Sequence, residues 1–279
     1  MKSLALVNIF VSFFMFDQVR GQTDFVKSRD SVRIAYEIHG DGPALIFVHG
    51  WSCDRSYWKN QLGSFSKNFK VVAIDLGGHG ESGLERKTWT IEAFGSDVAA
   101  VIKKLGLTRV ILIGHSMGGD VIAETARQLT GDVLGLIMID TYKKLGTGRT
   151  PEEVNAFIAK LKPDFKDSTR TFVRNMFGAH ADTSLINWVA QDMSSAPAAI
   201  ALDALEHSFS YSRQMPHTLE EIKLPVIALN SDNSPTDVKS MEQYGVQVMI
   251  MHGVGHFMMM EDPDHFNKLL KTAIDKLAQ

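Results

Sequence analysis

Six short runs of apolar, largely β-branched residues constrain the fold of this chain more than any other feature. They lie at residues 44–48, 71–74, 110–113, 134–139, 226–229 and 246–251. Apart from Gln247 in the last run, they are apolar, which is typical of strands buried on both faces, and such strands belong to parallel sheets. An alternating run at residues 32–38 instead predicts a half-buried antiparallel strand.

Amphipathic helical patterns separate these runs. The clearest has apolar residues at spacings of three and four across residues 91–105, and Gly106 follows it as a C-terminal cap. Another begins at Asp262, a capping residue followed by Pro263 at the first helical position. Strands that alternate with helices in this way predict a doubly wound, mostly parallel α/β sheet.

The alternation stops between residues 142 and 223, where the pattern is helical and no strand is indicated. We interpret this stretch as a helical cap inserted into the core. The sequence therefore divides into a leader at 1–21, a first core segment at 22–141, the cap at 142–223 and a second core segment at 224–279.

The first residues have the parts of a secretory signal peptide. Lys2 precedes an apolar run at residues 4–16, and polar residues follow up to a cleavage position after Gly21. The apolar run is shorter than the roughly 20 residues that a membrane span needs. We expect a secreted or periplasmic protein without stable membrane insertion after leader removal, and a cytoplasmic protein is the alternative.

Charge and cysteine content exclude some partners. The 279 residues carry a formal net charge of −3, and the charges are scattered without the basic stripe that binds nucleic acid. Cys53 is the single cysteine, so no intramolecular disulfide is possible. His252 and His256 are four residues apart but lack a carboxylate motif, so we expect no metal site. The oligomeric state leaves no signal in the sequence.

The segment 114–118, Gly-His-Ser-Met-Gly, places Ser116 between the apolar run at 110–113 and an amphipathic helical stretch. A serine at such a strand-to-helix turn is typical of a nucleophile elbow. Its dihedral angles are strained, and the flanking positions are crowded enough to favour glycine. We therefore predict that Ser116 is a nucleophile.

A serine nucleophile needs a base and a group that stabilises the oxyanion. His256 lies just after the last predicted strand, at the same sheet edge as Ser116, and histidine is the suitable base near neutral pH. Trp51 follows the strand at 44–48 in the segment His-Gly-Trp. Its backbone N–H and that of Met117 together can form an oxyanion hole.

Four segments together resemble the α/β-hydrolase superfamily: His-Gly-Trp at 49–51, Asp-Leu-Gly-Gly-His-Gly-Glu-Ser at 75–82, Gly-His-Ser-Met-Gly-Gly at 114–119, and Gly-His at 255–256. The resemblance extends from about residue 25 to the end of the chain. It implies an eight-stranded, mostly parallel sheet with a helical cap after the sixth strand. It also implies Ser116 as nucleophile, His256 as base, and Trp51 and Met117 as oxyanion donors.

The sequence departs from the family pattern at the position of the acid that orients the histidine. The usual position after the seventh strand falls on Ser234, and Asp232 lies two residues earlier. Asp140, at the end of the sixth strand, matches a position that some relatives use instead. Asp140 is our first choice because its register needs no deletion, Asp232 stays open, and Asp237 is a more remote alternative.

These residues predict a serine hydrolase that cleaves a small-molecule carboxylic ester or lactone through an acyl-enzyme, without a cofactor. Relatives that hydrolyse epoxides or haloalkanes carry aspartate at the position of Ser116, which argues against those reactions. Carbon–carbon bond hydrolysis and perhydrolysis remain alternatives. A ligand-binding sensor with slow or no turnover on the same scaffold is another.

Overall fold

The computed structural model describes residues 22–129 and 131–279, so the predicted leader lies outside the described residues. Its strands form one eight-stranded sheet in the order β1-β2-β4-β3-β5-β6-β7-β8. They are β1 Asp24–Lys27, β2 Arg33–His39, β3 Ala44–Val48, β4 Lys70–Ile74, β5 Val110–His115, β6 Val133–Ile139, β7 Val226–Ser231 and β8 Val246–Met251. β2 pairs antiparallel with β1 and β4, and the other pairs are parallel. The predicted fold class is confirmed.

Each strand expected from an apolar or alternating pattern is present, but β1 was not expected from the residues themselves. β1 has four residues, Asp-Phe-Val-Lys, three of them exposed, and it pairs with β2 at the edge of the sheet. An exposed edge strand has no buried face that would impose an apolar pattern. By contrast, β3 is buried at every position because both of its faces are covered.

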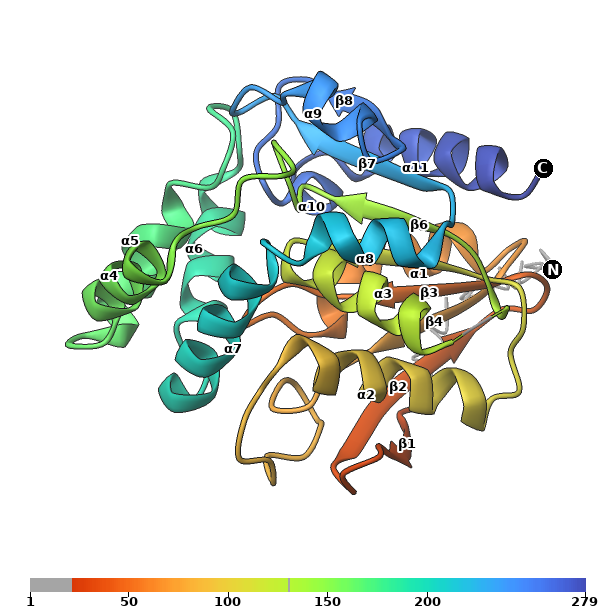
Figure 1. The fold of residues 1–279 in the computed structure, drawn as a ribbon, viewed down its shortest axis with the longest axis horizontal. Helices are drawn as coiled ribbons and strands as arrows, with labels where there is room; N and C mark the ends of the chain where they lie inside the picture. Colours follow the sequence, from red (N-terminus) through yellow and green to blue (C-terminus); the bar gives the residue numbers. More distant parts are fainter. Residues whose placement is uncertain (1–21, 130) are drawn as a thin grey trace, which may run out of the picture.

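Helices cover both faces of the sheet (Figure 1). α2, α3 and α8 lie side by side on one face, and α1 and α11 lie together on the other. The core helices are η1 Arg55–Trp58, α1 Lys59–Phe65, α2 Ile91–Lys104, α3 Met117–Gln128, α8 Met215–Ile222, α9 Val238–Glu242, α10 Met258–Glu261 and α11 Pro263–Leu277. Among the described helices, none has the length and apolar content to cross a bilayer.

Between β6 and α8 the chain forms a separate group of helices to one side of the sheet (Figure 1). They are α4 Pro151–Leu161, α5 Phe165–Arg174, α6 Thr183–Met193 and α7 Ala198–Tyr211. The indole Nε1 of Trp51 donates to the carbonyl of Ala201 at 2.6 Å, and Tyr57 donates to Asp192 at 2.7 Å. These hydrogen bonds attach α7 and α6 to the loop after β3. α8, which the sequence analysis included in the cap, packs along α3 instead.

Candidate active site

Ser116 occupies the turn between β5 and α3 with φ 54° and ψ −122°, a strained conformation for a residue other than glycine. A Cβ on Gly114 would lie 2.2 Å from the carbonyl oxygen of Gly118, and a Cβ on Gly118 would lie 2.5 Å from that of Val48. Glycine is therefore required on both sides of the serine. The strained turn agrees with the conformation expected of the segment.

His256 lies in the loop after β8, where its Nδ1 is 2.8 Å from Oδ2 of Asp140. An ionised carboxylate only accepts hydrogen bonds, so Nδ1 carries a proton, and in the neutral tautomer of the ring the lone pair is then on Nε2. The backbone N–H of His256 donates to Met176 at 2.7 Å, and its carbonyl accepts from His115 Nε2 at 2.9 Å. These contacts hold the loop and set the direction of the ring.

Both oxygens of the Asp140 carboxylate accept hydrogen bonds. Its Oδ1 accepts from the backbone N–H of Ser231 at 2.8 Å, from the Ser231 hydroxyl at 3.0 Å and from Lys143 Nζ at 2.7 Å. Burial raises the pKa of Asp140, but the hydrogen bond and charge of His256 and the ammonium of Lys143 outweigh it and hold the pKa below its ordinary value. Asp140 is therefore ionised at neutral pH.

The structure does not bring Asp232 to His256. Its Oδ2 lies 3.0 Å from Nδ1 of His252, and its Oδ1 accepts from the backbone N–H of Gly253 at 2.9 Å. Asp237 accepts from the backbone N–H of Ser240 at 3.1 Å and caps α9. Of the three aspartates considered from the sequence, only Asp140 contacts His256.

The backbone N–H groups of Trp51 and Met117 are both unoccupied by protein acceptors within residues 22–129 and 131–279. A Cβ on Gly50 would lie 3.2 Å from the Cβ of Ser116, so the loop after β3 abuts the serine. Backbone donors without a protein acceptor close to the serine are a precondition of the predicted oxyanion hole.

His49, to which the sequence analysis gave no role of its own, orients one of these donors. Its Nε2 accepts from the backbone N–H of Leu76 at 3.0 Å, so its Nδ1 donates to the carbonyl of Gly50 at 2.8 Å. That carbonyl belongs to the peptide unit whose N–H is contributed by Trp51. Burial lowers the pKa of His49 to about 4, which keeps the ring neutral. The sequence signal for this role is the position of His49 directly before Gly50.

Ser116, Asp140 and His256 line one cavity of about 220 Å³. The loop after β3 contributes Trp51 and Cys53, and Arg149 comes from the segment before α4. The remaining wall is mostly apolar and comes largely from the cap: Phe172, Met176, Met193, Leu205, Phe209 and Phe257. The predicted nucleophile, base and acid therefore share a space in which a small apolar group can be bound.

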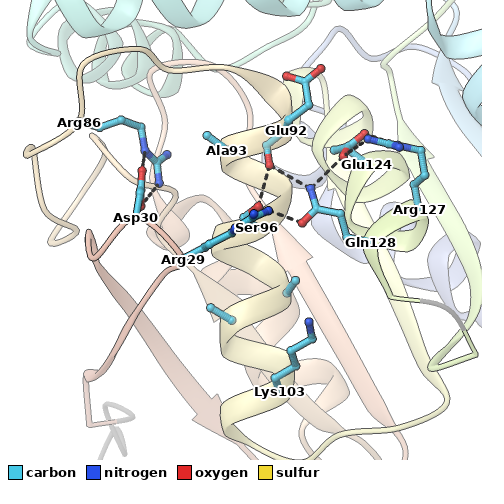
Figure 2. A pocket seen from close by; sticks show the side chains of 12 residues that line it. Arg29, Asp30, Arg86, Glu92, Ala93, Ser96, Lys103, Glu124, Arg127 and Gln128 are labelled. Carbon is cyan, nitrogen blue, oxygen red and sulfur yellow. Dashed lines mark hydrogen bonds and ion pairs between the residues drawn. The ribbon is translucent and has the colours of Figure 1, made fainter.

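A larger hollow of about 850 Å³ lies along α2 and α3, away from Ser116 (Figure 2). Its charged side chains are largely paired, since Arg86 contacts Asp30 at 2.6 Å and Arg127 contacts Glu124 at 2.8 Å. The hydroxyl of Ser96 donates to the carbonyl of Glu92 at 3.0 Å. This hollow lacks a serine next to a histidine, so the smaller cavity is the candidate active site.

Fold and site together define the class of α/β proteins in which a serine stands on a strained turn after a central parallel strand, beneath a helical cap. A family model described as alpha/beta hydrolase fold matches residues 43–219. The chain belongs to this family.

Curated relatives match either part of the chain or nearly all of it. A Mycobacterium tuberculosis protein of uncharacterised function is 33% identical over 107 residues, and the match covers 38% of this chain. The chain spans 31% of the length of that relative. An AB hydrolase superfamily protein of Bacillus subtilis is 25% identical over 267 residues, covering 88% of this chain and 97% of the relative.

Solved structures share the fold over most of the chain. An esterase from Thermogutta terrifontis has a TM-score of 0.79 at 23% identity and covers 92% of this chain and 100% of its own. An esterase from Exiguobacterium antarcticum has a TM-score of 0.81 at 20% identity, covering 91% of this chain and 100% of its own. At this level of identity the likeness concerns the fold alone.

Proposed function

We propose that this protein is a serine hydrolase that cleaves carboxylic esters or lactones through an acyl-enzyme on Ser116. The observation that carries the proposal is the 2.8 Å hydrogen bond between Asp140 and His256 in the cavity that Ser116 also lines. A Haemophilus influenzae relative named as a putative esterase/lipase, 27% identical over 246 residues, supports the choice of an ester as substrate.

In the proposed mechanism, His256 Nε2 takes the proton of the Ser116 hydroxyl as its oxygen attacks the substrate carbonyl. The backbone N–H groups of Trp51 and Met117 stabilise the oxyanion of the tetrahedral intermediate. His256 then gives its proton to the leaving alcohol, and water attacks the acyl-enzyme with the same histidine as base. Asp140 stays ionised throughout and stabilises the imidazolium.

The cavity limits the size of the substrate. Its volume of about 220 Å³ is below the roughly 300–1,000 Å³ of pockets for drug-sized ligands. The cap residues Phe172 and Met193 make the wall apolar and favour an aliphatic acyl or alcohol group, and the small volume favours a short one. We therefore propose that the preferred esters are small.

A panel of chromogenic esters of increasing acyl length, together with simple lactones, tests the proposal. We expect many turnovers per protein molecule on short esters, and loss of this activity in Ser116→Ala. A fluorophosphonate should add to the wild-type protein once, and peptide mass spectrometry should locate the adduct on Ser116. Ser96→Ala, in the larger hollow, is the matched control and should retain activity. Slow, single-turnover cleavage would instead favour a ligand-binding sensor.

A further inference from the structure

Arg149 is the single arginine or lysine among the described residues that line the candidate active site. It makes no ion pair within residues 22–129 and 131–279, although Glu152 and Glu153 follow it in the first turn of α4. In the first turn of α4, Glu153 is engaged by the backbone N–H of Thr150 at 2.8 Å. The cavity therefore holds a positive charge that no carboxylate of the described chain neutralises.

Aromatic rings position the guanidinium of Arg149. Its central carbon lies 4.6 Å from the ring centre of Phe209 and 5.4 Å from that of Phe157. Phe209 itself lines the cavity, so the guanidinium lies at the cavity wall. A guanidinium held over aromatic rings donates no hydrogen bond to another side chain there, so its N–H groups remain available to bind an anion.

The other charged groups of the cavity do not compete for Arg149. Both oxygens of Asp140 are occupied, by His256 on one side and by Lys143 and Ser231 on the other. Most of the remaining lining is apolar, so a carboxylate bound in the cavity has no other cationic side chain of the described lining to contact. A planar carboxylate matches the N–H edge of an arginine with two parallel hydrogen bonds.

We propose that Arg149 is a subsite for a carboxylate of the substrate, which places the substrate among small esters or lactones that carry a negative charge a few bonds from the scissile carbonyl. This inference rests on the proposed function. Half-esters of short dicarboxylic acids belong to this class and suit a cavity of about 220 Å³. The apolar wall then contacts the methylene groups between the two carbonyl carbons.

Two probes of nearly equal shape test the subsite: monomethyl glutarate, which is anionic, and methyl 5-oxohexanoate, in which an acetyl group replaces the carboxylate. Hydrolysis is followed by titration of the released acid. Because Arg149 is exposed, we expect Arg149→Met to lower kcat/KM for the anionic ester by only about three- to tenfold. The loss on the neutral ester should be clearly smaller, so the ratio of the two kcat/KM values reports on the subsite. Because Arg149 is exposed, added salt should reduce the preference of the wild-type protein for the anion.

Arg213→Met is the matched control, because Arg213 lies beside Gly148 but does not line the cavity. It should leave both rates unchanged. Equal losses on the two esters in Arg149→Met, or no loss on the anionic one, would overturn the subsite while leaving the hydrolase intact.

A binding measurement separates the subsite from the chemistry. Calorimetry on Ser116→Ala needs no turnover, and we expect monomethyl glutarate to bind this variant more tightly than it binds Ser116→Ala combined with Arg149→Met. If neither ester is hydrolysed but this difference in Kd persists, the subsite stands and the proposed catalysis fails. If the two Kd values are equal, the subsite is refuted whatever the hydrolysis assay gives.

Discussion

Two aspartate–histidine pairs of nearly the same geometry lie at the ends of neighbouring strands, and they differ in burial. Asp140 and His256 are 2.8 Å apart, and Asp232 and His252 are 3.0 Å apart. The side chains of the first pair are 3% and 16% exposed, and those of the second are 39% and 79% exposed. Water screens the exposed pair, whereas the buried charges interact strongly. Distance alone therefore does not identify a functional pair.

The two carboxylates also differ in their surroundings, although the pKa of each lies below its ordinary value. For Asp232 the causes are the hydrogen bonds from His252 and from the backbone of Gly253, which outweigh a smaller opposing effect of burial. For Asp140 burial acts in the opposite direction, and His256 and Lys143 overcome it. A lowered pKa is thus common to both pairs, and what distinguishes Asp140 is that its ionised form is maintained inside the protein beside Ser116.

The largest expected effect comes from removing the charge of the buried pair. In Asp140→Asn we expect kcat on a short ester to fall by about 10⁴, because the amide no longer selects the Nδ1–H tautomer of His256 or stabilises the imidazolium. KM should change little. Steady-state kinetics measures the effect, and circular dichroism with thermal melting checks that the variant is folded. A folded Asp140→Asn protein with near wild-type kcat would contradict the assignment.

The position and conformation of Ser116 could be predicted from the local sequence. The identity of the acid that contacts His256 could not be predicted, because it depends on loop geometry. The apolar run before Ser116 and the glycines beside it are local signals, and the strained turn follows from them. The partner of His256 is 116 residues away in sequence, so its identity depends on how the loops after β6, β7 and β8 fold together. For this reason the sequence favours Asp140 only slightly over Asp232.

The same limit applies to Lys143 and β1. The ammonium of Lys143 lies 2.7 Å from Asp140 and 2.6 Å from the carbonyl of Ser231, whereas the ammonium of Lys144 contacts neither. Nothing in the sequence distinguishes these two lysines. β1 lacks a buried face and therefore an apolar pattern. Buried elements constrain their own residues, whereas exposed strands and the contacts of loop side chains do not.

The second effect sharpens the comparison by changing the surroundings of the buried pair. Lys143→Met removes a positive charge that helps to hold the pKa of Asp140 below its ordinary value, so in the variant the carboxylate takes up a proton at higher pH and the acidic limb of kcat/KM moves to higher pH. We expect a reduction of roughly two- to threefold at the acidic end of the profile, with little change at alkaline pH. Lys144→Met is the matched control, because Lys144 lies 3.8 Å from Asp237 instead. Coincident pH profiles for wild type and Lys143→Met would show that Lys143 has no such role.

The third effect concerns a buried carboxyl that has no cationic partner among the described residues. Asp120 accepts hydrogen bonds from Tyr142 and, at 2.7 Å, from Ser208. Burial raises its pKa to about 7. The folded protein thus keeps a proton that the unfolded chain loses at about pH 4, and the contribution of Asp120 to stability falls as the pH rises from about 4 to about 7.

Asp120→Asn should remove this dependence. In urea denaturation, the stability of the variant relative to wild type should increase between about pH 4 and 7 and then stay constant. Asp41→Asn, at a carboxylate that is 98% exposed, serves as the control and should show no such trend. A difference between Asp120→Asn and wild type that is independent of pH would mean that Asp120 is already ionised in the fold.

The smallest expected effect is at the exposed pair, and it is the most direct test of what burial contributes. In Asp232→Asn the carboxylate is lost but an amide oxygen can still accept from Gly253, so kcat/KM on short esters should stay at the wild-type value and the melting temperature should fall only slightly. Salt should already weaken the wild-type pair, so the difference in melting temperature should shrink further at high ionic strength. A loss of activity in Asp232→Asn as large as that expected for Asp140→Asn would contradict this prediction. It would mean that the loops after β7 and β8 rearrange on substrate binding, so that the difference between the two pairs exists only in the unliganded protein.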